Sequence, residues 1–345
     1  MKNLKQDYYN AAFSHIYVEK AVADHVRTKM ILSCFPSASV IEIDHYKDVF
    51  CRRGQDCGKQ HRAQKLILAE KKGKLIYRGA PVCQNFGNER FYYTSCIMNC
   101  IYDCEYCYLK GMYPSANLVI FVNLEDFFEE VRQLIKRDSL YLCVSYDTDL
   151  IALEKIAGYA GAWCDFAKGR ENLKIEVRTK CAHKQFFGER EPSGNVIFAF
   201  TLSPGAVAAA YEHFVPPLSE RIACAAKAAR LGFLVRLCFD PIIYVPGWQS
   251  HYQEMLDEVF AAVDPEKILD VSVGSFRIAK DYLKNMRRQT PDSAVVWFPY
   301  QNDAGYCHYP DELMEKMEQY LFSKLEQWTG KEKIFLWNET GKQQL

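Results

Sequence analysis

Residues 93–110 read YTSCIMNCIYDCEYCYLK and place three cysteines, Cys100, Cys104 and Cys107, at positions i, i+4 and i+7. Thiolates are the ligands that iron–sulfur clusters use, and three of them on one short loop can converge on a single cluster. Three ligands leave one iron of a [4Fe-4S] cluster open, and an open iron can bind a small molecule. Cys96 precedes the loop, at the expected end of a strand, so we do not expect it to be a ligand.

Other uses of these cysteines stay open. A structural zinc site normally takes four Cys or His ligands in paired spacings, and no second C-x-x-C pair follows the loop. The 14 cysteines and the start MKNLKQDYYN, which has no apolar signal segment, favour metal binding in a reducing compartment over disulfides. We therefore expect a cytoplasmic protein. A chance arrangement of core cysteines is the third alternative.

From about residue 118 onward, short β-branched runs alternate with longer helix-like stretches, and one further strand precedes the loop. This alternation predicts repeated βα units and a parallel sheet, in an α/β fold of six or seven units that forms an open or partial barrel. The predicted strands are 90–95, 118–122, 141–145, 173–179, 196–201, 233–239 and 268–274, and the predicted helices are 124–136, 150–168, 218–231, 248–263 and 280–286.

The chain ends differ from this pattern. Residues 1–79, with the charged stretch RRGQDCGKQHR, suggest an N-terminal α/β subregion, 80–290 the barrel, and 291–345 a C-terminal β-hairpin and helix, with the turn at residues 302–305. The 43 basic and 43 acidic side chains cancel, so nucleic-acid binding would need a local basic patch. The apolar runs are too short to cross a bilayer, and we expect no membrane partner.

The cysteine spacing resembles that of the radical S-adenosylmethionine (SAM) superfamily, and wider segments resemble the spore photoproduct lyase family. These segments are the cysteine loop itself, VRTK at 177–180, FTLSP at 200–204, DPIIYVPGW at 240–248, and a hairpin followed by YPDE at 309–312. The resemblance implies a partial (β/α)6-type radical SAM barrel that reverses a thymine-dimer lesion, the spore photoproduct, in DNA. It also implies a [4Fe-4S] cluster, SAM as the source of a 5′-deoxyadenosyl radical, an electron donor such as ferredoxin or flavodoxin, and a monomer.

The resemblance also assigns site residues. Cys100, Cys104 and Cys107 match the cluster ligands, and Tyr106 and Tyr108 match tyrosines that assist radical transfer. Our strand prediction independently puts most of the implied SAM contacts at carboxyl ends of strands, where barrel enzymes build their sites. Asp240 stands where the family has a small residue that makes a backbone contact. Each role has a structural alternative. The two tyrosines could simply pack over the loop, Lys180 could be a solvated lysine at a strand end, and Asp149 and Asp240 could cap helices. The implied SAM contacts are Tyr108, Thr148, Asp149, Lys180, Thr201 and Asp240.

The hydrogen-atom donor departs from the family pattern. Family members carry a donor cysteine in a C-T-S-D segment, and this chain has Tyr146-Asp147-Thr148-Asp149 there. A thiol usually quenches a carbon radical faster than a phenol, so we expect Cys83 to be the donor. Cys143 is the second candidate, although a cysteine inside a strand is commonly a core residue. Tyr146 is the third.

A dimer inside a duplex must be extruded before an enzyme can act on it. The hairpin at 300–309 resembles the element that does this in the family, and Tyr306, His308 and Tyr309 would stack or wedge there. Basic side chains on the preceding helix could contact phosphates, although an ordinary solvated helix would look the same. They are Lys280, Lys284, Arg287 and Arg288.

Two other functions remain open. The chain could be a radical SAM enzyme acting on a peptide or a modified nucleoside, which the missing donor cysteine favours. It could also be a non-catalytic zinc-dependent nucleic-acid-binding protein. Stimulation of deoxyadenosine turnover by damaged DNA tests the first alternative. Colour tests the second, since an iron–sulfur protein is brown and a zinc protein is colourless.

Overall fold

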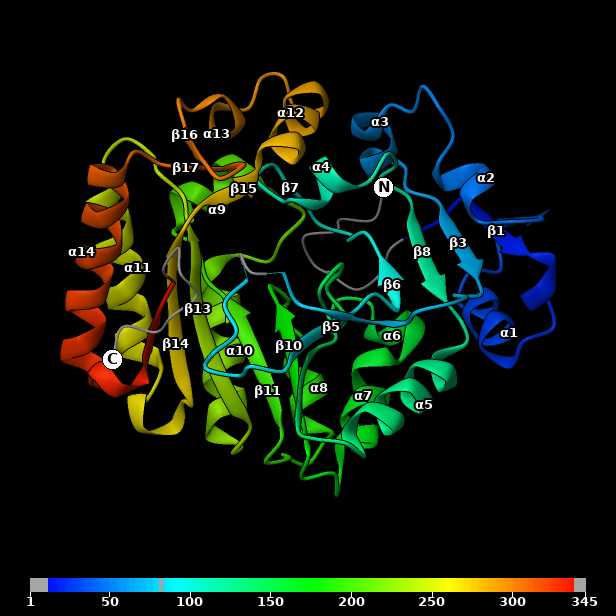
Figure 1. The fold of residues 1–345 in the computed structure, drawn as a ribbon, viewed down its shortest axis with the longest axis horizontal. Helices are drawn as coiled ribbons and strands as arrows, with labels where there is room; N and C mark the ends of the chain where they lie inside the picture. The colour runs from blue at the N-terminus through cyan, green and yellow to red at the C-terminus, as the bar shows by residue number, and fades with distance from the viewer. Residues whose placement is uncertain (1–11, 81–82, 338–345) are drawn as a thin grey trace.

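The computed structural model describes residues 12–80 and 83–337, and its largest element is an eight-stranded sheet (Figure 1). The strand order is β4-β5-β9-β10-β11-β13-β14-β18. Neighbouring strands run parallel except at the β4 edge, where β4 and β5 are antiparallel. The predicted α/β class and parallel sheet are confirmed, and both edges stay open. The strands are β4 Ile76–Arg78, β5 Phe91–Thr94, β9 Leu140–Cys143, β10 Leu173–Thr179, β11 Val196–Thr201, β13 Leu234–Ile242, β14 Asp270–Ser275 and β18 Ile334–Leu336.

The sheet forms because its strands are apolar on both faces. Every residue of β11, VIFAFT, is buried, as expected for a parallel strand covered on both sides. Helices that connect the strands pack against the sheet (Figure 1). The predicted helix at 150–168 is two helices, because Gly158 adopts a left-handed conformation with φ of 68°. The helices are α5 Leu124–Ile135, α6 Glu154–Ala157, α7 Tyr159–Ala167, α8 Lys184–Gly188, α9 Gly205–Tyr211, α10 Leu218–Arg230, α11 Trp248–Ala262 and α14 Asp311–Thr329.

A second sheet, ordered β2-β1-β3-β8-β6, lies beside the first and includes a strand that we expected in the barrel. Most of the predicted strand 118–122 forms β8, which pairs in parallel with β3 and antiparallel with β6. The expectation that this strand belongs to the barrel is therefore wrong, and the cysteine loop runs between two strands of the second sheet. The three-part division of the chain stays a prediction, although β4, β6 and β8 cross its boundary at residue 79. The elements of this region are β1 His15–Glu19, α1 Val26–Ser33, β2 Ser39–Ile43, α2 Lys47–Phe50, α3 Cys57–Arg62, β3 Leu66–Ala69, β6 Ile97–Met98 and β8 Leu118–Phe121.

The predicted C-terminal hairpin is present and lies at the top of the molecule in Figure 1. Strand β17 pairs antiparallel with both β15 and β16. Beside it, α12 packs closely on the short helix α4 that ends the cysteine loop. This close approach requires glycine at position 111, because a side chain at Gly111 would meet the backbone of Tyr282. Among the described residues, no helix is long and apolar enough to span a membrane. The elements are α4 Leu109–Met112, β15 Arg277–Ala279, α12 Lys280–Gln289, α13 Ala294–Trp297, β16 Gln301–Asp303 and β17 Tyr306–His308.

Candidate functional site

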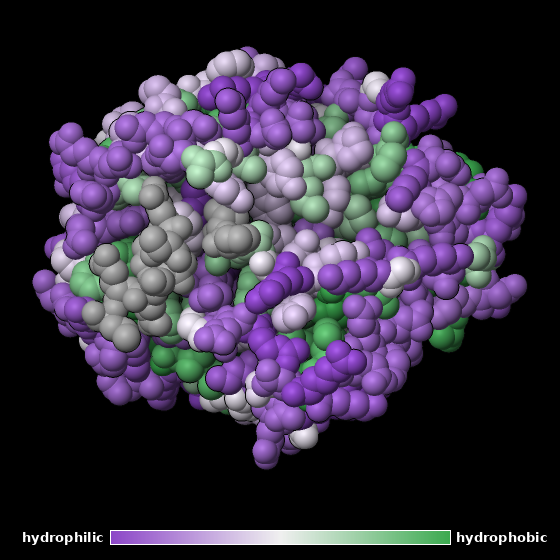
Figure 2. Space-filling model, in the orientation of Figure 1, coloured by the Kyte–Doolittle hydropathy of each residue, from purple (hydrophilic) through white to green (hydrophobic). Residues whose placement is uncertain are grey.

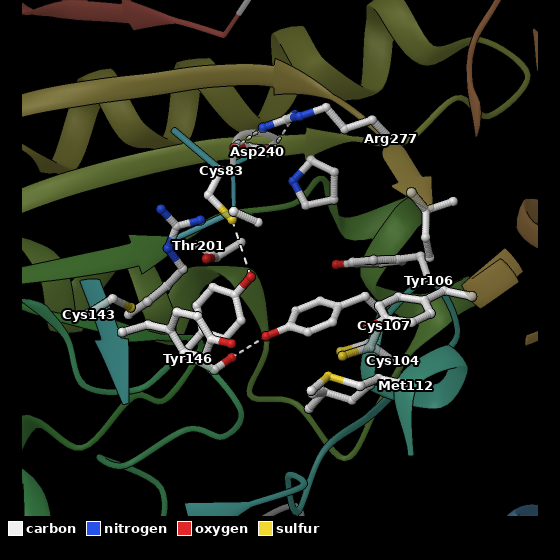
Figure 3. Close-up of a pocket in the computed structure, with 18 of the residues that line it drawn as sticks. Cys83, Cys104, Tyr106, Cys107, Met112, Cys143, Tyr146, Thr201, Asp240 and Arg277 are labelled. Carbon is white, nitrogen blue, oxygen red and sulfur yellow. Dashed lines mark hydrogen bonds and ion pairs between the residues drawn. The ribbon is translucent and has the colours of Figure 1, made fainter. Parts of the chain in front are cut away.

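The cysteine loop is fixed mainly by backbone contacts. The short strand β7 (Asp103–Cys104) pairs antiparallel with β12 (Glu212–His213), which puts Glu212 opposite Cys104. The carbonyl oxygen of Cys100 accepts a hydrogen bond of 2.9 Å from Gln64 Nε2. Cys100, Cys104 and Cys107 all line one cavity of about 760 Å³, and Figure 3 shows Cys104 and Cys107 on one side of it.

These three thiols fit a [4Fe-4S] cluster better than a single metal ion. Burial raises the pKa of Cys104 to about 12 and also raises the pKa values of Cys100 and Cys107, so their thiolates need a cation beside them. Within residues 12–80 and 83–337, no three His, Cys, Asp or Glu side chains converge as one ion requires. Sulfurs that share one zinc lie at most about 4.6 Å apart, whereas in a cluster each thiolate binds a different iron. Three thiols that do not converge on one ion are therefore compatible with a cluster.

Lys180, at the end of β10, reaches the cysteine loop. Its Nζ lies 2.8 Å from the Tyr106 hydroxyl, 3.4 Å from Glu212 Oε1 and 3.8 Å from Cys104 Sγ. Burial opposes the charge on Lys180, but Cys104, Tyr106 and Glu212 outweigh it and raise its pKa above the ordinary value. The lysine therefore stays cationic beside the loop, and the alternative of a solvated lysine does not describe it.

Glu212 and Arg221 form a buried pair under Lys180 that the sequence did not lead us to expect. Arg221 Nη2 lies 2.5 Å from Glu212 Oε2, the two side chains are 1% and 0% exposed, and the Tyr106 hydroxyl also donates to Glu212. Burial would raise the pKa of Glu212, but Lys180 and Arg221 lower it to about 2. The available signal was the position of Arg221 on the same helix face as Ala225 and Ala228, four and seven residues later.

The residues assigned to SAM all line the same cavity as the thiols. Thr148 Oγ1 is buried and has no hydrogen-bond partner among the described residues, so it is available to a ligand. The Asp149 carboxylate instead accepts from Thr179 Oγ1 and from the backbone N–H groups of Lys180 and Ala152. Asp149 therefore positions the end of β10. It does not cap the helix that follows, as our alternative had it, because the N-cap of α6 is Leu153 and has no side-chain cap hydrogen bond. The cavity-lining residues of this set are Tyr108, Thr148, Asp149, Lys180, Thr201 and Asp240.

Asp240 forms an ion pair across the cavity wall with Arg277 (Figure 3). Its two carboxylate oxygens lie 3.2 and 3.3 Å from the guanidinium nitrogens, and both side chains are 10% exposed. The Arg277 guanidinium also lies 4.0 Å from the centre of the Trp337 ring. The charge of Asp240 is thus balanced by the protein itself.

Cys83 and Tyr146 lie across the cavity from Cys104 and Cys107 (Figure 3). Cys83 Sγ is 3.2 Å from the Tyr146 hydroxyl, and the Tyr146 ring stacks on Tyr93 with ring centres 4.1 Å apart. The Tyr108 hydroxyl donates to the backbone oxygen of Tyr146, so Tyr108 touches both the cysteine loop and the Cys83 side of the cavity. Cys143 also lines the cavity but is only 5% exposed.

A charged network holds the segment that carries Cys83. Phe86, three residues after Cys83, lies over the Arg236 guanidinium, with 3.3 Å between the guanidinium carbon and the ring centre. Arg236 is buried and ion-paired with both Asp270 and Glu176. This cation–π contact anchors the segment to β13.

The residues of the hairpin and α12 that we expected to bind DNA lie in different environments. Tyr306 and Lys280 line the cavity, and Lys284 and Arg288 are exposed. Arg287 donates to the Val296 carbonyl and stacks on Trp297, so it holds α13 in place. Tyr309 is 1% exposed and packs against Phe298 and Tyr300. Contrary to expectation, Tyr309 is buried and holds the hairpin region together, and the half-exposed Arg287 is engaged with α13.

His308 is also buried in the hairpin, and its charge should make the hairpin sensitive to pH. Desolvation opposes protonation, but bonds to Asp303 (2.7 Å) and the Tyr309 carbonyl, with Asp311 nearby, raise the His308 pKa above its ordinary 6.5. These contacts therefore stabilise the hairpin fully below pH 6.5 and are lost as the pH rises through the folded pKa.

We expect NMR titration of the His308 ring to give a pKa above 6.5, and Asp303→Asn to move it down towards that value. The exposed Asp292→Asn is the matched control and should leave the titration of His308 unchanged. An unchanged pKa in Asp303→Asn would contradict the assignment.

Comparisons with known proteins agree with this geometry. The model of the family described as spore photoproduct lyase matches residues 91–295, which include the cysteine loop and most of the large sheet. Among curated proteins, the chain is similar to the spore photoproduct lyase of Bacillus subtilis (strain 168), with 22% identity over 239 residues, 64% of this chain and 70% of the relative. It is also similar to that of Geobacillus sp. (strain Y412MC61), with 20% identity over 177 residues, 50% of this chain and 52% of the relative.

Solved structures match over nearly the whole length. A cysteine-to-alanine mutant of spore photoproduct lyase with dinucleoside spore photoproduct has a TM-score of 0.81 and 17% identity, covering 94% of this chain and 98% of that one. A double mutant that removes one cysteine and changes a serine to cysteine, with bound AdoMet and dinucleoside spore photoproduct, has a TM-score of 0.80, 18% identity and the same coverage. At these identities the likeness establishes the fold.

Proposed function

This chain belongs to the spore photoproduct lyase family, and from this premise we propose that it is a radical SAM enzyme that converts the spore photoproduct in DNA back to two thymines. The observation that carries the proposal is one cavity with two chemically different sides. The three thiols of the cysteine loop line one side, and the Cys83–Tyr146 pair lines the other. A lesion held between them would have a radical source and a hydrogen donor within one cavity.

Cys100, Cys104 and Cys107 would hold the [4Fe-4S] cluster. Lys180 would contact the SAM carboxylate, and the unpartnered Thr148 hydroxyl and Thr201, which line the same cavity, would bind other polar groups of SAM. When bound, the cluster and SAM would supply radical chemistry, in the form of a 5′-deoxyadenosyl radical able to take a hydrogen atom from the lesion. The protein binds and orients these partners and keeps water out.

Cys83 would return a hydrogen atom to the thymine radical that remains after the bond between the two bases breaks. The Cys83 S–H bond breaks and a C–H bond forms on the product, which leaves a sulfur radical. The Tyr146 hydroxyl, 3.2 Å away, can then give its hydrogen atom to Cys83, so that the thiol re-forms and the radical moves to the phenol. Tyr108, whose hydroxyl touches the Tyr146 backbone, lies between this pair and the cysteine loop.

Damaged DNA and a one-electron donor protein, such as ferredoxin or flavodoxin, would be the partners. Tyr306 and Lys280 at the cavity wall, with the exposed Lys284 and Arg288, are the side chains of the hairpin and α12 that remain suited to DNA. Tyr306 would stack in the gap left by the extruded lesion.

The test is repair of a dinucleotide spore photoproduct by the anaerobically reconstituted enzyme with SAM, followed as release of thymidylyl-thymidine. In Cys83→Ala we expect SAM cleavage to continue while most of the lesion leaves as adducts, because the product radical has lost its nearest thiol. Cys143→Ala, a buried thiol on the same cavity, is the matched control and should repair cleanly. Clean repair by Cys83→Ala would reject Cys83 as donor, and SAM cleavage without any loss of lesion in wild type would reject the substrate.

A further inference from the structure

A basic segment that this chemistry does not use lies on α2 and α3. Residues 47–65 carry six Lys and Arg side chains against two Asp side chains, in a chain whose total charge is zero. We call the exposed side chains of Arg52, Arg53, Lys59 and Arg62 the α3 face. Among the described residues, Arg52, Arg53 and Arg62 have no ion-pair partner, and this region of the surface is largely hydrophilic (upper right of Figure 2).

The α3 face lies directly behind the cysteine loop. Beneath it, His61 Nε2 is 3.4 Å from Asp103 Oδ1, and Gln64 Nε2 donates to the Cys100 carbonyl at 2.9 Å. A second cavity, of about 20 Å³, lies here and is lined by His61 together with Cys100, Cys104 and Cys107. The three thiols are therefore approached from two sides, the large cavity and the α3 side.

Of these two sides, the α3 side stays accessible during the proposed reaction. The large cavity would be filled by SAM and the lesion, and α12 and the hairpin contribute to its wall. A cavity of about 20 Å³ cannot admit a nucleotide, but electron transfer needs only proximity between the two redox centres and no channel. The small size of the cavity on this side therefore favours an electron carrier over DNA as the occupant of the α3 face.

We propose that the α3 face docks an acidic one-electron carrier protein, which reduces the cluster from behind the cysteine loop. This inference rests on the proposed function. One electron leaves the reduced carrier, which becomes oxidised by one electron, and the cluster gains it, with no bond made or broken. Complementary charge would speed the encounter and make it dependent on salt, as in other transient redox complexes.

Binding of oxidised flavodoxin, measured by calorimetry, tests the proposal without requiring turnover. We expect Arg53→Glu/Arg62→Glu to raise the Kd for flavodoxin by about tenfold or more at low salt, because two attractive charges become repulsive. The wild-type Kd should rise steeply with salt and the variant's should not. Lys174→Glu/Arg230→Glu makes the same charge change at two exposed positions, at the start of β10 and the end of α10, and should bind like wild type.

A second measurement compares the rate of cluster bleaching by reduced flavodoxin with that by dithionite. The Arg53→Glu/Arg62→Glu variant should be slow with flavodoxin and normal with dithionite, which also shows that its site is intact. Wild-type affinity for flavodoxin in this variant would overturn the proposal, and so would loss of DNA binding with flavodoxin binding unchanged. Absence of SAM cleavage with dithionite in wild type would instead reject the proposed function.

Discussion

Replacing Cys107 with alanine is expected to give a folded chain that no longer holds a four-iron cluster and no longer cleaves SAM. The proposed cluster has only three protein ligands, so the loss of one leaves two thiolates, and no other Cys, His, Asp or Glu converges with them among the described residues. Without the cluster no electron reaches SAM, so cleavage should fall to background. Iron and sulfide content, visible absorbance and release of 5′-deoxyadenosine are the measurements.

Cys96→Ala is the matched control for this prediction. Cys96 is fully buried, does not line the cavity, and lies four residues before Cys100, at the end of the strand region that leads into the loop. We expect Cys96→Ala to keep the brown colour and SAM cleavage. A cluster of unchanged iron content in Cys107→Ala would contradict the ligand assignment. A colourless wild-type protein that binds one zinc would support the zinc-binding alternative instead.

The features predicted best were those that depend on residues close together in the sequence. The cysteine spacing, the turn at residues 302–305 and the buried strands are local patterns, and they lie where expected. Residues at the carboxyl ends of parallel strands, such as Lys180 and Thr201, could also be placed, because all those ends meet at one edge of the sheet. Cys83 was proposed for its position just before a strand, and its segment does reach the cavity.

Features that depend on distant pairings could not be read from the sequence. Strand β8 has the same apolar pattern as the barrel strands, and only its pairing with β3, about 50 residues earlier, assigns it to the second sheet. Strand β18 has three residues and is a strand because β14 lies beside it. Tyr309 and Arg287 have the composition of a DNA-binding surface, but Phe298, Tyr300 and Trp297 bury or engage them.

Glu212→Ala is expected to lower the free energy of unfolding by about 3–5 kcal/mol, because it leaves Arg221 as a buried charge without its partner. Denaturant unfolding of the cluster-free chain measures this effect. Glu220→Ala is the matched control, since Glu220 forms an exposed ion pair with Lys184 and its removal should cost less than about 1 kcal/mol. Similar decreases in the free energy of unfolding of the two variants would contradict the prediction, because they would show that breaking the buried pair costs no more than breaking the exposed one.

Glu212→Ala should also weaken SAM binding, because Glu212 lies 3.4 Å from Lys180 Nζ and accepts a hydrogen bond from the Tyr106 hydroxyl. We expect the Kd for SAM to rise by about tenfold or more, the scale seen when a group that orients a ligand is removed. The double variant Glu212→Leu/Arg221→Met separates the two roles, because replacing a buried ion pair by apolar side chains is often nearly neutral for stability. It should regain most of the lost stability while its SAM affinity stays low. Recovery of SAM affinity together with stability would show that Glu212 acts on the site only through folding, and a double variant as unstable as Glu212→Ala would show that the unpaired Arg221 is not the cause.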